Sequence, residues 1–309
     1  MLRLWEELNR VENLFLELLD DPKKKDVLLY LICYCQLVRR DGEYEVELPK
    51  LINCAEKPYK YISGNWQDVL LELGVLYLKD KKGKVYTGKE ILLVKNPEGF
   101  KVGILPDYRE DFYKFYTKLL KYWSVLNSRR TLGSNTTPDY YTPLLVHTFN
   151  EKLFKEAQYF SEILAMRFPK EKNLFLSVKL VSEFYREYAK TGRVKADNLN
   201  DAINFLSDTP DVFYSVNVKK FKKDIKKFLE NLNKGEFYYI TIEFASENRG
   251  KKRSILSKLW NFIKSLGGKR WNSRSSGMDY YSFIEHLLKK HRRQMMRSLE
   301  SSTPRLQGT

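Results

Sequence analysis

The chain has 309 residues, 43% apolar and 14% aromatic, which is enough to bury a substantial core and excludes wholesale disorder. Its net charge of +16 indicates a polyanionic partner or an acidic membrane surface. Residues 240–309 carry 15 Lys and Arg against 5 Asp and Glu, whereas residues 1–50 carry 8 against 11, so we expect the electrostatic contact surface in the second half.

The first predicted element is an amphipathic helix. Its apolar residues step by four and three, at Leu4, Leu8, Val11, Phe15 and Leu18. We interpret this stripe as packing on its own domain. The seam of a homodimer is the alternative, although two heptads are short for a coiled coil. The same N-terminus carries acidic residues where a signal peptide needs an unbroken apolar stretch.

Residues 26–39 are apolar almost all round and predict a buried helix. The longest apolar run, 27–38, has 12 residues and is too short to span a bilayer. The chain's three cysteines are Cys33, Cys35 and Cys54, too few for a disulfide framework, and the Cys33–Cys35 spacing does not suit a zinc knuckle. We expect a soluble cytoplasmic protein that makes no contact with a membrane.

The next elements follow the order of a winged helix-turn-helix domain. After the buried helix come a short element over 47–53, a helix that ends at Gly74, and a hairpin within KDKKGKVYTGKE, residues 79–90. We interpret the hairpin as a DNA-binding wing whose lysines meet sugar–phosphate. An ordinary solvated hairpin is the alternative.

The stretch 79–90 also has the Gly-x4-Gly-Lys spacing of a phosphate-binding loop. Such a loop needs glycine-rich backbone and a hydroxyl directly after the lysine. Here Glu90 follows Lys89, and the residues between the two glycines favour a strand. We therefore do not expect an NTPase.

Candidate DNA contacts in the first half lie around the second helix and at the hairpin tip. Asn65 and Gln67 are residue types that hydrogen-bond to adenine edges, although Asn65 is also a good helix cap. The lysines expected at phosphates are Lys57, Lys60, Lys81, Lys82 and Lys84.

Residues 112–126 repeat the four-three apolar spacing and predict a long helix. Residues 127–143 are rich in Ser, Thr, Asn, Gly and Pro and predict a linker. The second half is then expected to repeat the first. A helix over 174–189 leads into KTGRVKADNLNDAIN, which aligns with RRDGEYEVELPKLIN at 39–53 when one gap is allowed. A lysine-rich helix over 218–233, a strand over 236–244 and a basic turn complete the expected second winged domain.

The lysine-rich helix has one apolar stripe, and lysines cover its remaining surface. Like charges at i,i+3 and i,i+4 repel by a few tenths of a kcal/mol per pair, which a counter-charge would relieve. Since this face lacks Arg, Asn and Gln, we expect it to bind the backbone and not read bases; a solvated face is the alternative. Candidate contacts in the second half are Lys219, Lys222, Lys223, Lys226, Lys227, Arg249, Lys251, Lys252 and Arg253.

The sequence therefore predicts a mainly α fold with small β-hairpins (α+β), in which two winged helix-turn-helix domains are joined by a helix and a linker. The expected parts are an N-terminal domain, a connecting helix and linker, a basic C-terminal domain, and a basic helix and tail, spanning 1–105, 106–143, 144–263 and 264–309.

Enzyme chemistry has few candidate residues. The histidines are His147, His286 and His291, and the last two are five apart, so they do not share a helix face. The Asp-Tyr-Tyr sequence at 139–141 recurs at 279–281, which we attribute to chance in a chain with 21 tyrosines. We expect a binding protein without catalytic activity, metal, cofactor or small-molecule ligand.

The doubled winged-helix order resembles plasmid-type replication initiators, in which two winged domains straddle an iterated origin site. The resemblance covers residues 20–90 and 170–255 and rests on element order and charge placement. It implies sequence-specific binding of double-stranded DNA by a plasmid or mobile-element replication initiator; a transcription regulator is also compatible with the fold. The alternative is an RNA-binding subunit of a ribonucleoprotein, such as an RNA-guided defence complex, with Tyr238, Tyr239 and Trp271 stacking on unpaired bases.

Overall fold

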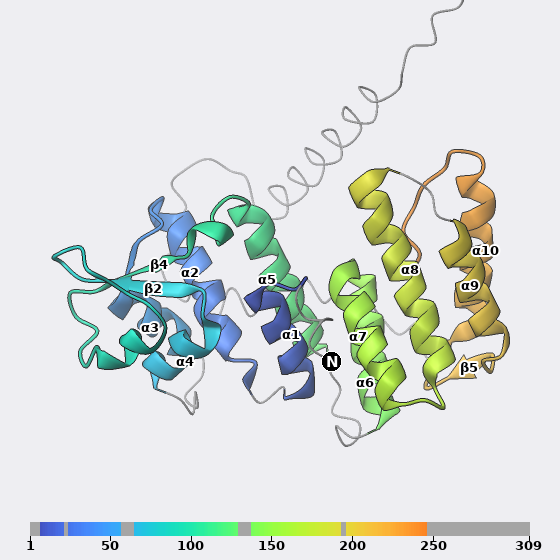
Figure 1. Ribbon diagram of the computed structural model, residues 1–309, viewed down its shortest axis with the longest axis horizontal. Coiled ribbons are helices and arrows are strands. Elements are labelled where there is room, and N and C mark those ends of the chain that lie inside the picture. The colour runs from blue at the N-terminus through green and yellow to red at the C-terminus, as the bar shows by residue number, and fades with distance from the viewer. Residues whose placement is uncertain (1–6, 22–23, 57–64, 129–136, 193–195, 246–309) are drawn as a thin grey trace, which may run out of the picture. The chain divides into compact units, whose positions relative to one another are not determined.

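A computed structural model describes residues 7–21, 24–56, 65–128, 137–192 and 196–245 (Figure 1). They are mainly helical with a small antiparallel sheet, as the sequence predicts. Several predicted features lie outside the described residues, namely Lys57, Lys60, Arg249, Lys251, Lys252, Arg253, Trp271 and the part 264–309.

The first half holds the sheet and the helices around it. Its elements are α1 (Arg10–Asp20), α2 (Val27–Asp41), β1 (Val46–Glu47), α3 (Leu48–Glu56), α4 (Trp66–Leu73), β2 (Leu76–Lys79), β3 (Val85–Tyr86), the 3-10 helix η3 (Gly88–Leu93), β4 (Lys101–Ile104), the 3-10 helix η4 (Pro106–Tyr108) and α5 (Phe112–Asn127).

Helix α2 is buried along most of its length, as its apolar sequence predicts. It ends where Gly42 adopts a left-handed conformation, with φ of 77°, and donates its N–H to the Val38 carbonyl. Helix α1 starts at a capping box between Asn9 and Glu12. The apolar stripe of α1 within the described residues is buried in the protein's own core, so it offers no dimer seam.

The sheet has the strand order β1-β4-β2-β3, and every neighbouring pair is antiparallel. Strand β4 pairs with β2 from Leu76↔Ile104 to Lys79↔Lys101. Gly103, in the middle of β4, lies against the ring of Tyr77, where a Cβ atom would collide with that ring. Helix α5, which was predicted to be a connector outside the first domain, packs on α2.

The second half has the elements α6 (Pro138–Asn150), α7 (Phe154–Arg167), α8 (Lys172–Thr191), α9 (Ala196–Ser207), β5 (Val212–Phe213), β6 (Val216–Asn217) and α10 (Val218–Leu232). Each helix from α6 to α9 packs on the next, and α10 packs on α9. No described helix has the length and apolar composition needed to cross a bilayer.

The expected internal repeat does not extend beyond two helices. Gly42 and Gly192 both end helices in left-handed conformations, and both Ile-Asn pairs lie on the following helix. After that the halves differ, because α9 is followed by the β5–β6 hairpin and then by α10.

The segment 236–244 is not the predicted hairpin strand. Its one ladder contact is an isolated bridge between Val216 and Phe244. Side chains, rather than a second strand, satisfy part of its backbone, because Tyr185 and Asn150 bond to Ile240 and Ile242.

A disulfide between Cys33 and Cys54 joins α2 to α3, and Cys35 is free and buried. A single bridge was not predicted, because these cysteines were considered only for a disulfide framework or a metal site. The bonded residues are separated by 21 positions, so the bridge closes a long loop in the unfolded chain and stabilises the fold.

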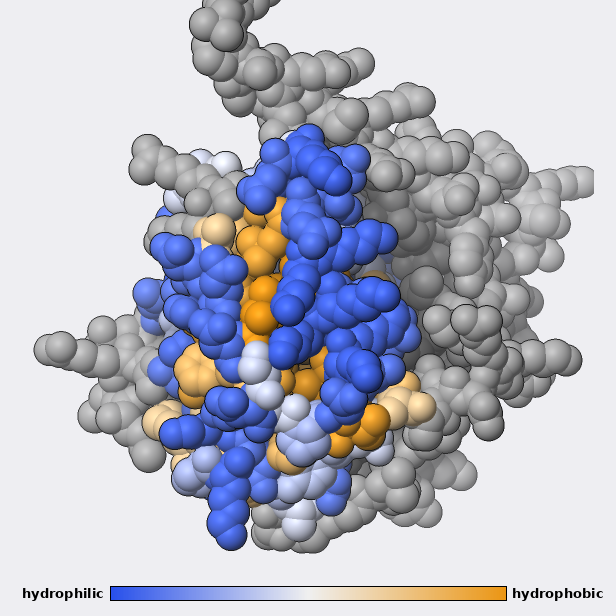
Figure 2. All heavy atoms as spheres, turned by 90° about the vertical axis from the view of Figure 1, so that its right-hand side faces the viewer, coloured by the Kyte–Doolittle hydropathy of each residue, from blue (hydrophilic) through white to orange (hydrophobic). Residues whose placement is uncertain are grey.

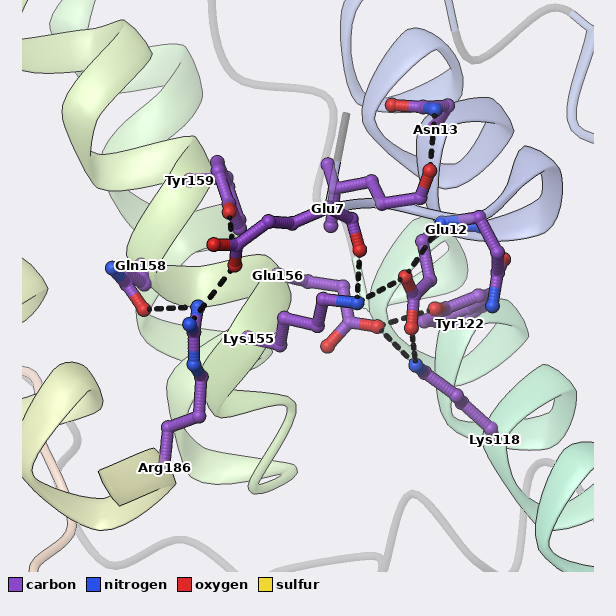
Figure 3. A network of polar contacts seen from close by, with 12 residues as sticks. Glu7, Glu12, Asn13, Lys118, Tyr122, Lys155, Glu156, Gln158, Tyr159 and Arg186 are labelled. Atoms are coloured by element: carbon purple, nitrogen blue, oxygen red, sulfur yellow. Dashed lines mark hydrogen bonds and ion pairs between the residues drawn. The ribbon is translucent and has the colours of Figure 1, made fainter. Parts of the chain in front are cut away.

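A buried ionic cluster joins the two halves of the described chain (Figure 3). Lys118 of α5 places its Nζ 2.5 Å from the carboxylate of Glu12 and 2.6 Å from that of Glu156. Lys155 of α7 lies 2.8 Å from Glu12, and the Tyr122 hydroxyl donates to Glu156 at 2.5 Å. Glu12 and Glu156 are only 5% and 1% exposed, so two ammonium groups balance two carboxylates that water cannot screen.

Burial alone would raise the pKa of Glu12. The ammonium groups of Lys118 and Lys155 and the backbone N–H of Asn9 outweigh burial, so the pKa lies below its ordinary value. Near the cluster, Glu7 accepts hydrogen bonds from Tyr159 at 2.9 Å and Arg186 at 3.0 Å.

Reduction of the Cys33–Cys54 disulfide is expected to lower the free energy of unfolding by about 3 kcal/mol, because the unfolded chain loses a long closed loop. Urea titrations of oxidised and reduced wild type measure this loss. The variant Cys54→Ser should behave like reduced wild type and should not respond to reductant. An equal response of wild type and variant to reductant would contradict the bridge.

Replacing Lys118 with Met should lower the free energy of unfolding by about 3–5 kcal/mol, because it leaves buried carboxylates without their shared counter-charge. Lys114→Met, on the same helix, is the control. Its ion pair with Asp111 joins side chains that are 72% and 64% exposed, so its loss should cost less than about 1 kcal/mol. Chemical denaturation compares the two variants, and equal losses would refute the cluster's structural role.

The two proteins should also differ in their response to pH. Because the pKa of Glu12 is lowered in the fold, wild type loses this contribution as the pH falls from about 4.3 through the folded pKa. The Lys118→Met variant keeps only the ion pair of Glu12 with Lys155, so it has less of this contribution to lose. The stability difference between the two proteins should therefore shrink as the pH falls.

Candidate nucleic-acid interface

Helix α10 is amphipathic, and its apolar side is buried at Val218, Phe221, Ile225 and Phe228. Asn217 caps its first turn by accepting a hydrogen bond from the Lys220 N–H at 3.0 Å. Since the buried side fixes the rotation of the helix, the lysines between the apolar positions point outward or lie at the border. Figure 2 looks onto the side where Figure 1 labels α9, α10 and β5, and hydrophilic side chains cover most of it around a narrow apolar strip.

The predicted contact lysines of α10 differ in their partners. Lys219 pairs with Asp211 at 3.2 Å, but both side chains are at least 70% exposed, so the pair contributes little. Lys222 donates to the hydroxyl of Ser207 at 2.8 Å, so its described partner is an uncharged group. The remaining three make no ion pair with a carboxylate of the described chain, and all are exposed: Lys223, Lys226 and Lys227.

Lys220 was not among the predicted contacts, and the structure neutralises it. Its Nζ lies 2.6 Å from Glu243 and 3.5 Å from Asp224. The i,i+4 spacing of Lys220 and Asp224 could have been found in the sequence. Glu243 lies 23 positions away, and no local pattern indicates that pair.

The hairpin expected at 79–90 is present. Asp80 organises its tip, accepting the N–H groups of Lys82 and Lys84 at 2.8 and 2.9 Å, and Gly83 takes a φ of 85°. Lys81, Lys82 and Lys84 are exposed there, and none pairs with a described carboxylate.

The predicted exclusion of a phosphate-binding loop agrees with this geometry. A 3-10 helix, η3, begins at Gly88 with a capping box between Thr87 and Glu90, so Glu90 serves as part of a cap. The strand–loop–α-helix that cradles phosphate is not formed by these residues.

The two expected base-reading residues have structural roles around α4. Asn65 caps the helix by accepting the Gln67 N–H at 3.4 Å, and capping was the predicted alternative to base reading. The Gln67 amide donates to the Val94 carbonyl at 3.1 Å. Helix α4 contains no Lys or Arg, and its acidic residues are Asp68 and Glu72. Reading a base edge would require Gln67 to give up its bond within the fold.

Tyr238 and Tyr239, the aromatic residues suggested for stacking on unpaired bases, pack within the protein. The Tyr239 ring lies 5.6 Å from that of Phe154, with the Lys152 Nζ 4.1 Å from its centroid. The Tyr238 ring meets Phe228 edge-on at 5.1 Å. Both rings therefore already have partners in the fold.

The α10 lysines and the hairpin lysines belong to different halves of the described chain. No hydrogen bond or ion pair joins α10 to the β2–β3 hairpin in the part of the chain that the structure describes. Among the same residues, no group of three His, Cys, Asp or Glu side chains could hold a metal. Tyr140 and Tyr141 of the first Asp-Tyr-Tyr sequence are buried, and the Tyr141 hydroxyl donates to Asp20.

No protein-family model matches the chain, and no solved structure matches it. The resemblance to plasmid replication initiators stays a prediction from element order and charge.

Replacing Asn65 with Ala should lower the free energy of unfolding by about 1 kcal/mol, because the first turn of α4 loses its cap. Asn65→Asp keeps a capping oxygen and should retain stability. Denaturant titration of the two variants tests the cap. If Asn65→Ala instead leaves stability unchanged and alters only the choice among DNA sequences, Asn65 is a reader and not a cap.

Proposed function

We propose that the protein binds double-stranded DNA through the phosphate backbone, with α10 as its main contact. The observation that carries this proposal is the set of lysines at 223, 226 and 227, exposed on one helix and without a described carboxylate partner. Their mutual repulsion is relieved by a polyanion, and phosphates that replace bound counterions supply that charge.

We further propose that the first half is a winged helix-turn-helix domain. The order α2, β1, α3, α4, β2 and β4 supports it, with β4 between β1 and β2 in the sheet. In this arrangement α3 and α4 form the helix-turn-helix, and the β2–β3 hairpin is the wing. Its exposed lysines at 81, 82 and 84 then contact phosphates beside the groove.

Backbone contact fits the described residues better than base reading. Helix α4 would occupy the recognition position, yet Gln67 is bonded within the fold and Asp68 would face phosphates with a like charge. We therefore propose that the described surface positions the protein on DNA. Within this proposal the protein acts by binding and not by catalysis, and the cellular role that the resemblance implies is replication initiation or transcription regulation.

The alternative of an RNA-binding subunit gains no support from the described aromatic residues, because the rings of Tyr238 and Tyr239 are engaged in the fold. Duplex DNA therefore stays the preferred partner. Unpaired DNA and RNA are the comparisons that test this preference.

The experiment measures fluorescence anisotropy of labelled duplex DNA, single-stranded DNA and RNA of matched length at several salt concentrations. Wild type should prefer the duplex. A triple variant, Lys223→Gln, Lys226→Gln and Lys227→Gln, should weaken binding to all duplex sequences alike. Its plot of log K against log salt should flatten by roughly 0.9 for each phosphate that the variant no longer neutralises.

The matched control replaces three exposed lysines that lie off α10, at 170, 172 and 190, with Gln. This control removes the same charge and should keep the wild-type salt slope. An unchanged slope in the α10 variant removes that helix from the interface. Tighter binding of RNA than of duplex DNA by wild type supports the RNA-binding alternative instead.

A further inference from the structure

The segment 236–244, which follows α10, has different hydrogen-bond partners along its two backbone edges. In an extended chain, the N–H and C=O groups of successive residues point to opposite edges. On one edge, Ile240 donates its N–H to the Tyr185 hydroxyl at 2.8 Å. Ile242 exchanges two 2.9 Å hydrogen bonds with the Asn150 side chain on the same edge. This edge is closed by helices α6 and α8.

The other edge is only partly covered. Strand β6 pairs with its end, because the Asn217 N–H donates to the Glu243 carbonyl at 2.8 Å and the Ala245 N–H donates to the Ser215 carbonyl at 2.6 Å. Strand β6 stops at Asn217, and the chain turns into α10. Beyond that point, the backbone groups of Tyr239 and Thr241 make no hydrogen bond with any described residue.

This unpaired stretch of edge borders an open pocket. The pocket has a volume of about 420 Å³ and lies between the segment and α10, from which Asp224, Lys227 and Asn231 contribute. Thr241 is exposed, and Tyr239 is 37% exposed. The unpaired N–H and C=O groups therefore border accessible space. Natural proteins usually protect such edges, because a free edge pairs readily with another chain.

The unpaired edge of Tyr239 and Thr241, together with the pocket beside it, is called the slot. We propose that the slot binds an extended acidic peptide, which adds to the segment as a strand in line with β6. Main-chain hydrogen bonds to Tyr239 and Thr241 would supply affinity that does not depend on peptide sequence. The wall formed by α10 would select side chains. The peptide takes the place that β6 would have filled had the chain not turned at Val218.

Charge on the α10 wall selects an acidic peptide. Lys227 is the one ionic side chain of the pocket lining that has no ion-pair partner among the described residues, and Lys223 lies one turn before it. Asp224, the other charged lining residue, already pairs with Lys220 at 3.5 Å. A carboxylate of the peptide is therefore expected beside Lys227.

Because Lys227 borders both the slot and the proposed DNA surface, an acidic peptide and DNA would compete at this residue.

The test uses a fluorescein-labelled peptide, Thr-Val-Glu-Val-Thr, and its N-methylated form, which lacks strand-pairing N–H groups. Anisotropy should rise with the first peptide and not with the second. Thr241→Pro removes one edge N–H at a position where an unpaired edge tolerates proline, whereas Thr241→Val keeps that N–H. We expect Thr241→Pro to weaken peptide binding at least tenfold and Thr241→Val to bind as wild type does.

Two further readouts keep the test independent of folding and of DNA binding. In wild type, the amide resonances of Tyr239 and Thr241 should shift when the peptide is added. Lys227→Gln should weaken binding of this peptide but not of its Thr-Val-Gln-Val-Thr analogue. Thr241→Pro should keep the duplex-DNA affinity of wild type, which separates the slot from the proposed DNA surface.

Any one of three results would contradict the proposal. The peptide does not bind to wild type, or it binds equally well to Thr241→Pro and Thr241→Val, or its N-methylated form binds to wild type as well as the unmodified peptide does. A fourth outcome is that a short single-stranded oligonucleotide shifts the two amide resonances while the peptide has no effect on them. That result would also contradict the proposal and would assign the pocket to unpaired nucleic acid.

Discussion

Phe221, Ile225 and Phe228 hold one side of α10 in the core, and this burial directs the lysines of the helix toward solvent. A 15-residue helix is marginal by itself in water, so tertiary packing is what keeps α10 helical. Each buried aromatic or aliphatic side chain contributes about 1.5–3 kcal/mol, whereas each close lysine pair costs a few tenths of a kcal/mol. The fold can therefore carry unpaired positive charge on this helix, and a polyanion can use it.

The ionic cluster around Lys118 attaches the helices that support α10 to the first half. Helix α7 carries Lys155 and Glu156, while α1 and α5 provide their partners. Burying charges is costly, and a contact made by apolar side chains of equal volume is often as stable as a buried ion pair. The cluster instead requires particular residues to meet, because any shift of α7 would leave buried carboxylates without counter-charges.

Long periodic elements could be predicted from the sequence, and long-range pairings could not. The apolar runs of α2, α5 and α10 and the turn at Gly83 identify helices and a hairpin, because their signals are local. The pairing of β1 with β4 joins residues far apart in the chain. The β5–β6 hairpin was missed because Tyr214 and Ser215 take positive φ values in its turn, where glycine or asparagine usually signals such a turn.

In the candidate site, too, local features could be predicted from the sequence and long-range contacts could not. Lysines on one helix face could be identified by spacing alone, whereas their neutralisation depends on residues such as Asp211 and Glu243 from other elements. The segment 236–244 was expected to be a strand because its sequence favours extended backbone. It is extended, but the side chains of Tyr185 and Asn150 replace a neighbouring strand on one edge.

Lysine acylation footprinting, with and without a double-stranded oligonucleotide, tests the role of α10 most directly, because it reports each ammonium group in the unaltered protein. Lys223, Lys226 and Lys227 should lose reactivity in the complex, while Lys170, Lys172 and Lys190 keep theirs. Unchanged reactivity along α10 in a protein that has bound the duplex would contradict the account.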